Sequence, residues 1–214
     1  GGAGADIITG STGADIITGG GGLDSLTGGT GNDIFNIDSA YDTITDLGGV
    51  AGGDTDVFVV AGVGLLNAID MVSFTANNQS SNAGTATFTA KSSGDRTINL
   101  SAVTGSGTFF INGADGSDII VGSARGDIIT GAGGDDTITG GAGNDSITSG
   151  AGNDIIIIAT AGEADGDTID GGADDDVLKL STGGTDTFST DNKLQNVETI
   201  QAHASGSTVV LTGQ

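Results

Sequence analysis

GADGSDIIVGSARGDIITGAGGDDTITGGAGND, residues 113–145, is the stretch that decides the fold of this chain. Counted in steps of nine from Gly113, it places an aspartate at the sixth position and an isoleucine at the eighth position of each step, and the pattern continues to residue 157. The aspartates are Asp118, Asp127, Asp136, Asp145 and Asp154. Such a strict internal period indicates stacked structural units, each of which offers one carboxylate to a ligand.

A second series of nonapeptides lies at the start of the chain. GGAGADIIT, GSTGADIIT, GGGGLDSLT and GGTGNDIFN begin at residues 1, 10, 19 and 28, and IDSAYDTIT at residue 37 keeps the aspartate but loses the glycines. Their sixth positions are Asp6, Asp15, Asp24, Asp33 and Asp42. After an interruption at residues 158–161, GEADGDTID and GGADDDVLK return to the phase with Asp167 and Asp176.

Each nonapeptide divides into a six-residue turn and a three-residue strand. The glycines allow positive φ angles and close backbone approach in the turn, and the last three residues favour β structure. Two turns and two strands close a coil of 18 residues, so repeat n should stack on repeat n+2. The eighth position then faces the core, and it is apolar in every repeat: Ile8, Ile17, Leu26, Phe35, Ile44, Ile120, Ile129, Ile138, Ile147 and Ile156.

The period is lost between about residues 46 and 112. Residues 54–60, 84–90, 95–103 and 107–113 have the composition and alternation of strands, and residues 63–74 are the one candidate for a short helix. Irregular solenoid coils or a small β-sandwich would both fit this segment, and we favour coils because no linker separates it from the second block. The expected divisions are a first repeat block with its closing strands at 1–60, a connecting β segment at 61–112, a second block at 113–180 and capping strands at 181–214.

Composition excludes several classes of protein. The formal net charge is -23, which makes nucleic acid and anionic membranes poor partners. There is no cysteine for a disulfide or a zinc-thiolate site. No apolar stretch is long enough to span a membrane, so we expect no direct membrane insertion. No arrangement of serine, cysteine and histidine suggests catalysis, and we expect a protein that is not an enzyme.

Calcium is the ligand that this repeat suits. Ca²⁺ takes six to eight oxygen ligands from carboxylates and backbone carbonyls, and two stacked glycine turns with one aspartate each supply both. Stacking pairs Asp6 with Asp24, Asp15 with Asp33, Asp118 with Asp136, Asp127 with Asp145, and Asp136 with Asp154. The candidate carbonyl ligands belong to glycines at the first and fourth positions: Gly1, Gly4, Gly10, Gly13, Gly19, Gly22, Gly113, Gly116, Gly131, Gly134, Gly140 and Gly143.

The metal should be necessary for folding. Two carboxylates about 4 Å apart repel each other by roughly 4 kcal/mol at an effective dielectric constant near 20. Each repeat buries one aliphatic side chain, worth about 1.5 to 3 kcal/mol, against the conformational entropy of nine residues rich in glycine. We therefore expect several calcium ions per chain and no folded repeat blocks without them.

These nonapeptides resemble the repeats-in-toxin (RTX) family, whose repeat GGxGxDxUx forms a parallel β-roll filled with calcium. The resemblance covers residues 1–45 and 113–179 and implies the all-β fold, export by a type I system and an extracellular location at the cell surface. Arg125 replaces a glycine in GSARGDIIT and should weaken the site of Asp127. Asp165 and Asp174 replace glycines in the last two repeats and would add carboxylates or alter the turn.

Three functions remain open from the sequence. The threonine-rich, lysine-poor strands and NVETI at residues 196–200 resemble bacterial surface-layer proteins, which implies self-association into a lattice and a polysaccharide anchor elsewhere in the chain. The alternatives are the C-terminal secretion module of an RTX toxin, protease or lipase, and an adhesin stalk. Seventh-position isoleucines should point outward as a docking face, or else reflect strand propensity alone: Ile7, Ile16, Ile34, Ile119, Ile128 and Ile155.

Overall fold

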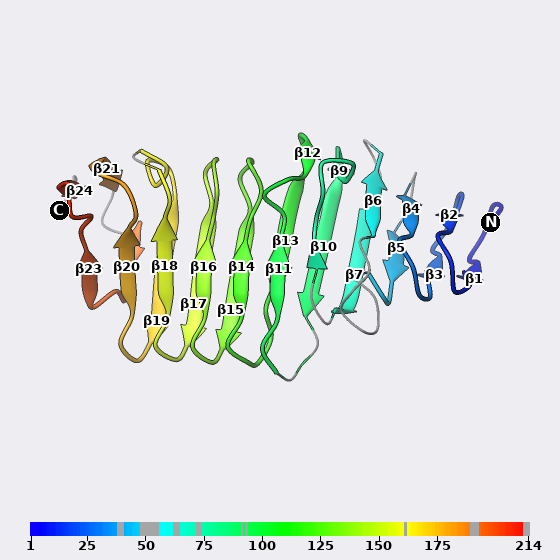
Figure 1. Cartoon of the computed structure of the whole chain (residues 1–214), viewed down its shortest axis with the longest axis horizontal. Helices are drawn as coiled ribbons and strands as arrows, with labels where there is room; N and C mark the ends of the chain where they lie inside the picture. Colours follow the sequence, from blue (N-terminus) through cyan, green and yellow to red (C-terminus); the bar gives the residue numbers. More distant parts are fainter. Residues whose placement is uncertain are drawn as a thin grey trace.

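The computed structural model describes residues 1–37, 41–47, 56–61, 65–71, 74–90, 92, 94–160, 162–188 and 193–211. Within these residues all regular secondary structure is β, in 24 strands. Every strand pairing is parallel, and the coils follow one another in single file with the two termini at opposite ends of the long axis (Figure 1). The predicted all-β parallel solenoid is confirmed.

The strands of the described residues form four parallel sheets. Sheet 1 runs in spatial order β1 (Ile7–Thr9), β3 (Ser25–Thr27), β5 (Tyr41–Ile44), β7 (Leu65–Met71), β10 (Thr85–Ala90), β13 (Thr108–Asn112), β15 (Ile128–Gly133), β17 (Ser146–Ala151), β19 (Thr168–Ala173) and β22 (Leu194–Gln195). Sheet 2 contains β8 (Phe74–Thr75), β11 (Thr97–Asn99), β14 (Ile119–Val121), β16 (Thr137–Thr139), β18 (Ile155–Ile158), β20 (Val177–Leu180) and β23 (Thr199–Gln201). Sheet 3 contains β2 (Ile16–Thr18), β4 (Ile34–Ile37), β6 (Val57–Val60), β9 (Ser81–Asn82) and β12 (Thr104–Gly105). Sheet 4 pairs β21 (Gly184–Phe188) with β24 (Ser207–Leu211).

The strand register confirms the stacking of repeat n on repeat n+2. Ile8 pairs with Leu26 across β1 and β3, and Ile120 pairs with Ile138 across β14 and β16. Each coil of a repeat block thus places one strand in sheet 1 and the next in sheet 3 or sheet 2. The strands align in parallel because identical nonapeptides present the same residue type at the same height of successive coils.

The connecting segment continues the solenoid, as the preference for coils over a sandwich predicted. β7 pairs with β5 on one side and β10 on the other, and β13 pairs with both β10 and β15. Successive strands β7, β8 and β9, and then β10, β11 and β12, belong to three different sheets. The central coils therefore have three strands where the repeat blocks have two.

The prediction of a short helix at residues 63–74 is wrong, because the described part of this stretch contains strands β7 and β8. Leu66 and Ala68 are buried with the alternation of a strand, and Met71 is buried after a register shift relative to β10. This β-irregularity gives the apolar residues the spacing of a helix face although the backbone is extended.

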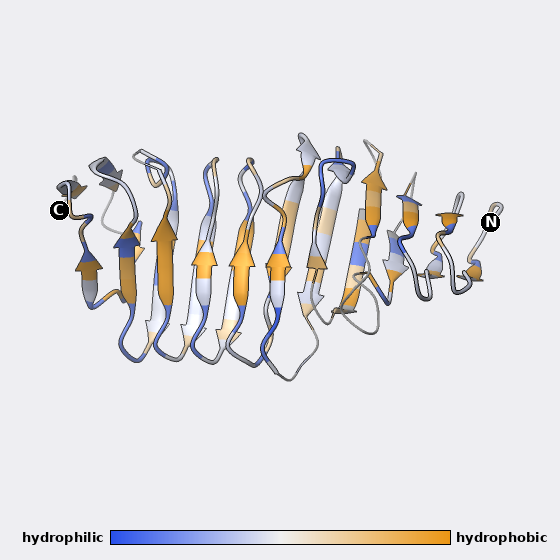
Figure 2. Cartoon of the chain, in the orientation of Figure 1, coloured by the Kyte–Doolittle hydropathy of each residue, from blue (hydrophilic) through white to orange (hydrophobic). Residues whose placement is uncertain are grey.

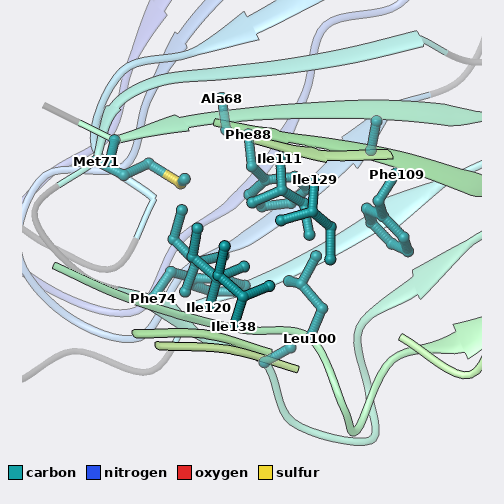
Figure 3. Close-up of a cluster of buried hydrophobic side chains, with 14 of the residues drawn as sticks. Ala68, Met71, Phe74, Phe88, Leu100, Phe109, Ile111, Ile120, Ile129 and Ile138 are labelled. Carbon is teal, nitrogen blue, oxygen red and sulfur yellow. The ribbon is translucent and has the colours of Figure 1, made fainter. Parts of the chain in front are cut away.

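A continuous core runs along the axis of the coils. The eighth-position side chains from Ile17 to Ile156 are at most 4% exposed, while Ile8 in the first coil is partly buried. Hydrophobic residues concentrate in the strands and hydrophilic residues in the turns (Figure 2). In the centre, Met71, Phe74, Phe88 and Phe109 point toward one another between the sheets (Figure 3).

The outward direction predicted for the seventh position is observed on the described strands. Ile7, Ile16, Ile119, Ile128 and Ile155 are exposed, from 88% for Ile7 to 38% for Ile155, whereas Ile34 is partly buried. No helix among the described residues is long and apolar enough to cross a membrane.

Candidate metal sites

The twelve predicted aspartates fall into two columns that run along the solenoid. Column 1 runs along sheet 1, and its residues directly precede the strands of that sheet except for Asp42, which lies within β5: Asp6, Asp24, Asp42, Asp127, Asp145 and Asp167. Column 2 consists of the residues that precede the strands of sheets 3 and 2: Asp15, Asp33, Asp118, Asp136, Asp154 and Asp176. All of them are buried except Asp6 and Asp15 of the first coil, which are partly buried.

Within a column, each aspartate after the first coil is bonded to the coil before it. Its Oδ1 atom accepts a hydrogen bond from the backbone N–H of the preceding sixth-position residue, as in Asp118 N to Asp136 Oδ1 at 2.8 Å and Asp136 N to Asp154 Oδ1 at 2.7 Å. The offset is 18 residues in both cases. The same bond joins every predicted pair, including Asp6 with Asp24, Asp15 with Asp33 and Asp127 with Asp145.

The second carboxylate oxygen is left for another ligand. Within the described residues, the Oδ2 atom is buried without a hydrogen-bond partner in Asp24, Asp118, Asp136, Asp145 and Asp176. A buried oxygen that accepts nothing costs about 1 to 3 kcal/mol, and more when it is charged. A row of such atoms, each on the same side of its turn, is the arrangement expected of ligands to cations.

First-position glycines make room for that ligand. A Cβ atom on Gly131 would clash with Asp136 Oδ2 of its own repeat and with the carbonyl oxygen of Ser149 in the next coil. A Cβ atom on Gly1 would likewise clash with Asp6 Oδ2 and the carbonyl oxygen of Gly19. A carboxylate oxygen and a carbonyl oxygen thus converge beside each of these glycines, because no side chain separates them.

Glycines at the second and fourth positions serve the backbone angles instead. Gly134 and Gly143 have φ angles of 113° and 130°, in the region that favours glycine. The fourth-position carbonyl of one coil points at the fourth glycine of the next, as Gly116 O does at Gly134. The structure therefore places the first-position carbonyls beside the carboxylates and the fourth-position carbonyls in the contact between turns.

Burial raises the pKa of the carboxyl groups in the second block. The pKa of Asp136 and of Asp145 rises from 3.8 to about 7, mainly because burial disfavours the charged form, with a smaller contribution from neighbouring acidic residues in the columns. The pKa of Asp118, Asp167 and Asp176 rises to about 6 for the same main reason. The backbone N–H bonds to these carboxylates act in the opposite direction. The columns are therefore electrostatically strained when ionised without a cation.

The described residues fit calcium better than a transition metal. No group of three or more His, Cys, Asp or Glu side chains lies close enough to hold one ion in the part of the chain that the structure describes. The donors that do converge are carboxylate and carbonyl oxygens, which suit Ca²⁺ and Mg²⁺. The spacing of backbone carbonyls in flexible glycine turns favours the larger ion with its variable coordination. Bound calcium would supply positive charge to the unpartnered Oδ2 atoms.

Two acidic residues of column 2, and a third that binds a glycine turn outside the columns, were not predicted. Asp56 continues column 2 beyond Asp33, whose backbone N–H it accepts at 2.9 Å across 23 residues. Glu198 ends the same column at Asp176, with its Oε2 atom 2.8 Å from that backbone nitrogen. Asp46 accepts the N–H groups of Gly28 and Gly29. An acidic residue two positions before an apolar one, Phe58 or Ile200, marks Asp56 and Glu198 in the sequence, but longer coils move them out of the nine-residue phase.

The three residues that replace a fourth-position glycine make different contacts. Arg125 does not enter column 1: its Nε atom donates to the carbonyl of Gly105 at 3.1 Å, and Ser123 donates its backbone N–H and hydroxyl to Asp127. Asp174 adopts a φ of 82° at the position of the missing glycine. Asp165 accepts the N–H of Thr187 and lies at the exposed edge of its turn.

Comparison with known proteins supports this assignment of the repeat. Residues 1–35, 121–156 and 161–187 match the family model of the RTX calcium-binding nonapeptide repeat (four copies). No curated protein matches the chain. The matched residues lie in both repeat blocks, extend seven residues into the capping segment and leave out the connecting segment. The chain therefore contains nonapeptide repeats similar to the RTX calcium-binding repeat, folded as a β-solenoid.

Proposed function

We propose that this chain is a calcium-dependent structural protein, in which bound calcium ions complete the core of a stiff β-solenoid. The observation that carries the proposal is the row of buried Oδ2 atoms without hydrogen-bond partners, each beside a first-position glycine. The net charge of -23 adds a general repulsion that divalent cations relieve. In this function the chain has no catalytic activity, and it folds after export, where calcium is abundant.

At the finer level, we propose that the solenoid is a segment of a self-assembling bacterial surface layer. Support comes from its exposed seventh-position isoleucines and its acidic turns. Ile119 and Ile155 lie in sheet 2 with Thr137 between them in register, which gives that sheet an outer face with few charges. Self-association through such faces, with calcium between acidic turns of neighbouring subunits, would form the lattice. Attachment to cell-surface polysaccharide would use another part of the chain.

Folding on calcium is the first test. The purified chain in excess EGTA should show a far-ultraviolet circular dichroism spectrum with little β structure, and millimolar calcium should restore the β spectrum. Magnesium at the same concentration is the control and should restore far less. A β spectrum unchanged by EGTA would contradict the proposal.

A single column residue tests the sharing of ions between coils. Asp136 contributes to the intervals toward Asp118 and toward Asp154. Asp136→Asn should therefore remove or weaken two adjacent calcium sites, measured as calcium bound per chain at saturation. Asp135→Asn is the matched control, because Asp135 lies on the exposed side of the turn and accepts the N–H of Asn153. Unaltered stoichiometry in Asp136→Asn would count against shared sites.

Assembly separates the surface-layer function from the alternatives. On addition of calcium, the purified protein should form ordered two-dimensional arrays visible by negative-stain electron microscopy, and EGTA should dissolve them. A protein that folds with calcium and stays monomeric in light scattering would favour the secretion module of a toxin, protease or lipase, or an adhesin stalk. Aspartate substitutions at Ile119 and Ile155 should prevent arrays without preventing folding.

A further inference from the structure

Ser149 occupies a first position of the repeat, where the motif has glycine. It opens the unit SGAGNDIII at residues 149–157, whose aspartate and inward isoleucine remain in phase. Its neighbour Gly150 pairs with Gly172 across β17 and β19, so Ser149 lies in register with the first-position Gly171 of the next coil. Ser149 therefore places a side chain in the row of first positions, where the motif has none.

Beside the first-position glycines, the same two oxygen atoms recur. A Cβ atom on such a glycine would lie 2.9 Å or less from the Oδ2 atom of the aspartate in its own unit and from a carbonyl oxygen of the next coil. This holds at Gly1, Gly10, Gly113, Gly122, Gly131 and Gly171. These glycines thus leave open the place where a carboxylate and a carbonyl ligand converge.

The Ser149 side chain bonds to one of these two oxygens. Ser149 is fully buried, and its Oγ atom donates a hydrogen bond to the Gly171 carbonyl oxygen at 2.6 Å. This carbonyl is the counterpart of the Ser149 carbonyl, which lies beside Gly131 one coil earlier. A serine hydroxyl has a single proton, and this bond uses it. The carbonyl ligand of the interval between Asp154 and Asp176 is therefore already bonded within the protein.

The hydroxyl also lies beside the second oxygen atom of the pair. Burial raises the pKa of Asp154, and the Ser149 side chain acts against this rise. Because the hydroxyl proton is donated to Gly171, the buried Asp154 Oδ2 atom has no hydrogen-bond partner among the described residues. The Cβ and Oγ atoms of Ser149 thus occupy the space between the two oxygens that would hold an ion, and the residues of this interval do not fit calcium.

We infer that the Ser149 side chain closes the interval between Asp154 and Asp176, so that this one interval of column 2 binds no calcium ion. A hydrogen bond from serine takes the place of the ionic bridge between the two coils. The column continues through the interval, because the Asp154 N–H still donates to Asp176 Oδ1 at 2.8 Å. Asp154 then shares an ion only with Asp136. This inference rests on the proposed calcium-dependent fold.

Restoration of the motif is the first arm of the test. Ser149→Gly removes the Cβ and Oγ atoms, so the variant should bind one calcium ion more per chain than the wild type, measured by equilibrium dialysis at saturating calcium. Ser146→Gly is the matched control, because Ser146 lies on the same strand with an exposed side chain, and it should bind the wild-type number. Equal calcium counts in the two variants would overturn the inference, and so would a Ser149→Gly chain that does not fold in saturating calcium.

Removal of the hydroxyl alone is the second arm. Ser149→Ala keeps the Cβ atom in the ion position, so the variant should bind the wild-type number of calcium ions. It should unfold at a lower urea concentration, because the buried Gly171 carbonyl loses its donor. Loss of one ion in Ser149→Ala would identify the hydroxyl as a calcium ligand and refute the inference. A wild type that does not fold with calcium would instead refute the proposed function itself.

Discussion

At the scale of the residue, glycines at different positions of the turn are required for different physical reasons. The second and fourth positions need glycine for positive φ, whereas the first needs it because a carboxylate oxygen and a carbonyl oxygen occupy the place of a side chain. Ala132 at a second position, with a φ of 84°, shows that the angle alone can be met by alanine at a cost. At the first position alanine cannot replace glycine in this way, because its Cβ would occupy the space of the two oxygen atoms.

Gly131→Ala tests this distinction. The added Cβ would clash with Asp136 Oδ2 and the Ser149 carbonyl, so we expect loss of at least one calcium ion per chain and a large rise in the calcium needed for folding. Gly133→Ala is the matched control two residues away. Its Cβ would meet only Asp115 Oδ1, at 3.4 Å, so it should change neither quantity appreciably. Isothermal titration calorimetry would measure the number of calcium ions bound and the affinity in each variant. Equal values in the two variants would contradict the role assigned to the first-position glycine.

Because of the raised pKa values, the stability of the fold should change with pH in opposite directions in the calcium-free and the calcium-bound protein. A carboxyl with a pKa of about 7 in the folded chain and about 4 when unfolded, such as Asp136, stabilises the calcium-free fold below pH 4, and this contribution is lost as pH rises through 7. Without calcium, β structure should therefore increase as pH falls from 8 to 5. With calcium, the same change should weaken folding because protons compete for the ligands. Circular dichroism across this pH range, with and without calcium, would measure the two opposite trends in β structure. The same trend in both conditions would contradict the prediction.

At the scale of the element, the central strands replace ions with aromatic packing. Phe88 lies 5.4 Å from Phe58, 6.0 Å from Phe74 and 5.7 Å from Phe109, measured between ring centroids. Ala86, Phe88 and Ala90 form the buried face of β10, as their alternation predicted. In this part of the solenoid, burial of apolar surface supplies the stability that, in the proposed function, the glycine turns obtain from calcium.

Phe88→Ala should destabilise the central coils by about 3 to 5 kcal/mol, because it leaves a cavity among three aromatic rings. Phe110→Ala, on the adjacent strand β13 with a side chain 40% exposed, should cost far less. Urea unfolding at saturating calcium would compare the two. A similar loss of stability in both variants would show that the aromatic cluster is not the centre of the core.

The sequence predicted the periodic elements and missed those that depend on coil length. Fixed steps of nine were enough to place Ile138 in the core and Asp136 in line with Asp118 and Asp154. Longer coils lengthen the offset to 23 residues at Asp56 and 22 at Glu198, so a count of nine loses column 2 at these residues although the backbone bonding continues. The strand β7 was predicted as a helix for a related reason. One extra residue in its bulge changes the spacing of buried side chains without ending the strand.

At the scale of the whole molecule, the two blocks differ in the length of column 2. Column 2 joins Asp118, Asp136, Asp154 and Asp176 to Glu198 in the second block, but only Asp15, Asp33 and Asp56 in the first. In a linear array, stability is the sum of unit and nearest-neighbour contributions, so a longer run of shared sites folds more cooperatively.

The second block should therefore fold at lower calcium than the first. Hydrogen–deuterium exchange with mass spectrometry along a calcium titration should show protection of peptides from residues 113–180 before those from residues 1–45. Peptides from β10 and β13 should gain protection with the second block or earlier. Protection that appears first in residues 1–45 would contradict the dependence on column length.

The 18-residue offset between parallel strands also has a mechanical consequence. Each folded coil advances the rod by about 4.8 Å, the distance between neighbouring strands. The same 18 residues, fully extended, reach about 60 Å, and as a flexible glycine-rich chain they span on the order of 23 Å. In the proposed calcium-driven folding, binding would shorten the chain several-fold along its own path and do work against a load at its two ends. The repeat would then be a linear contractile element that calcium shortens and chelation releases.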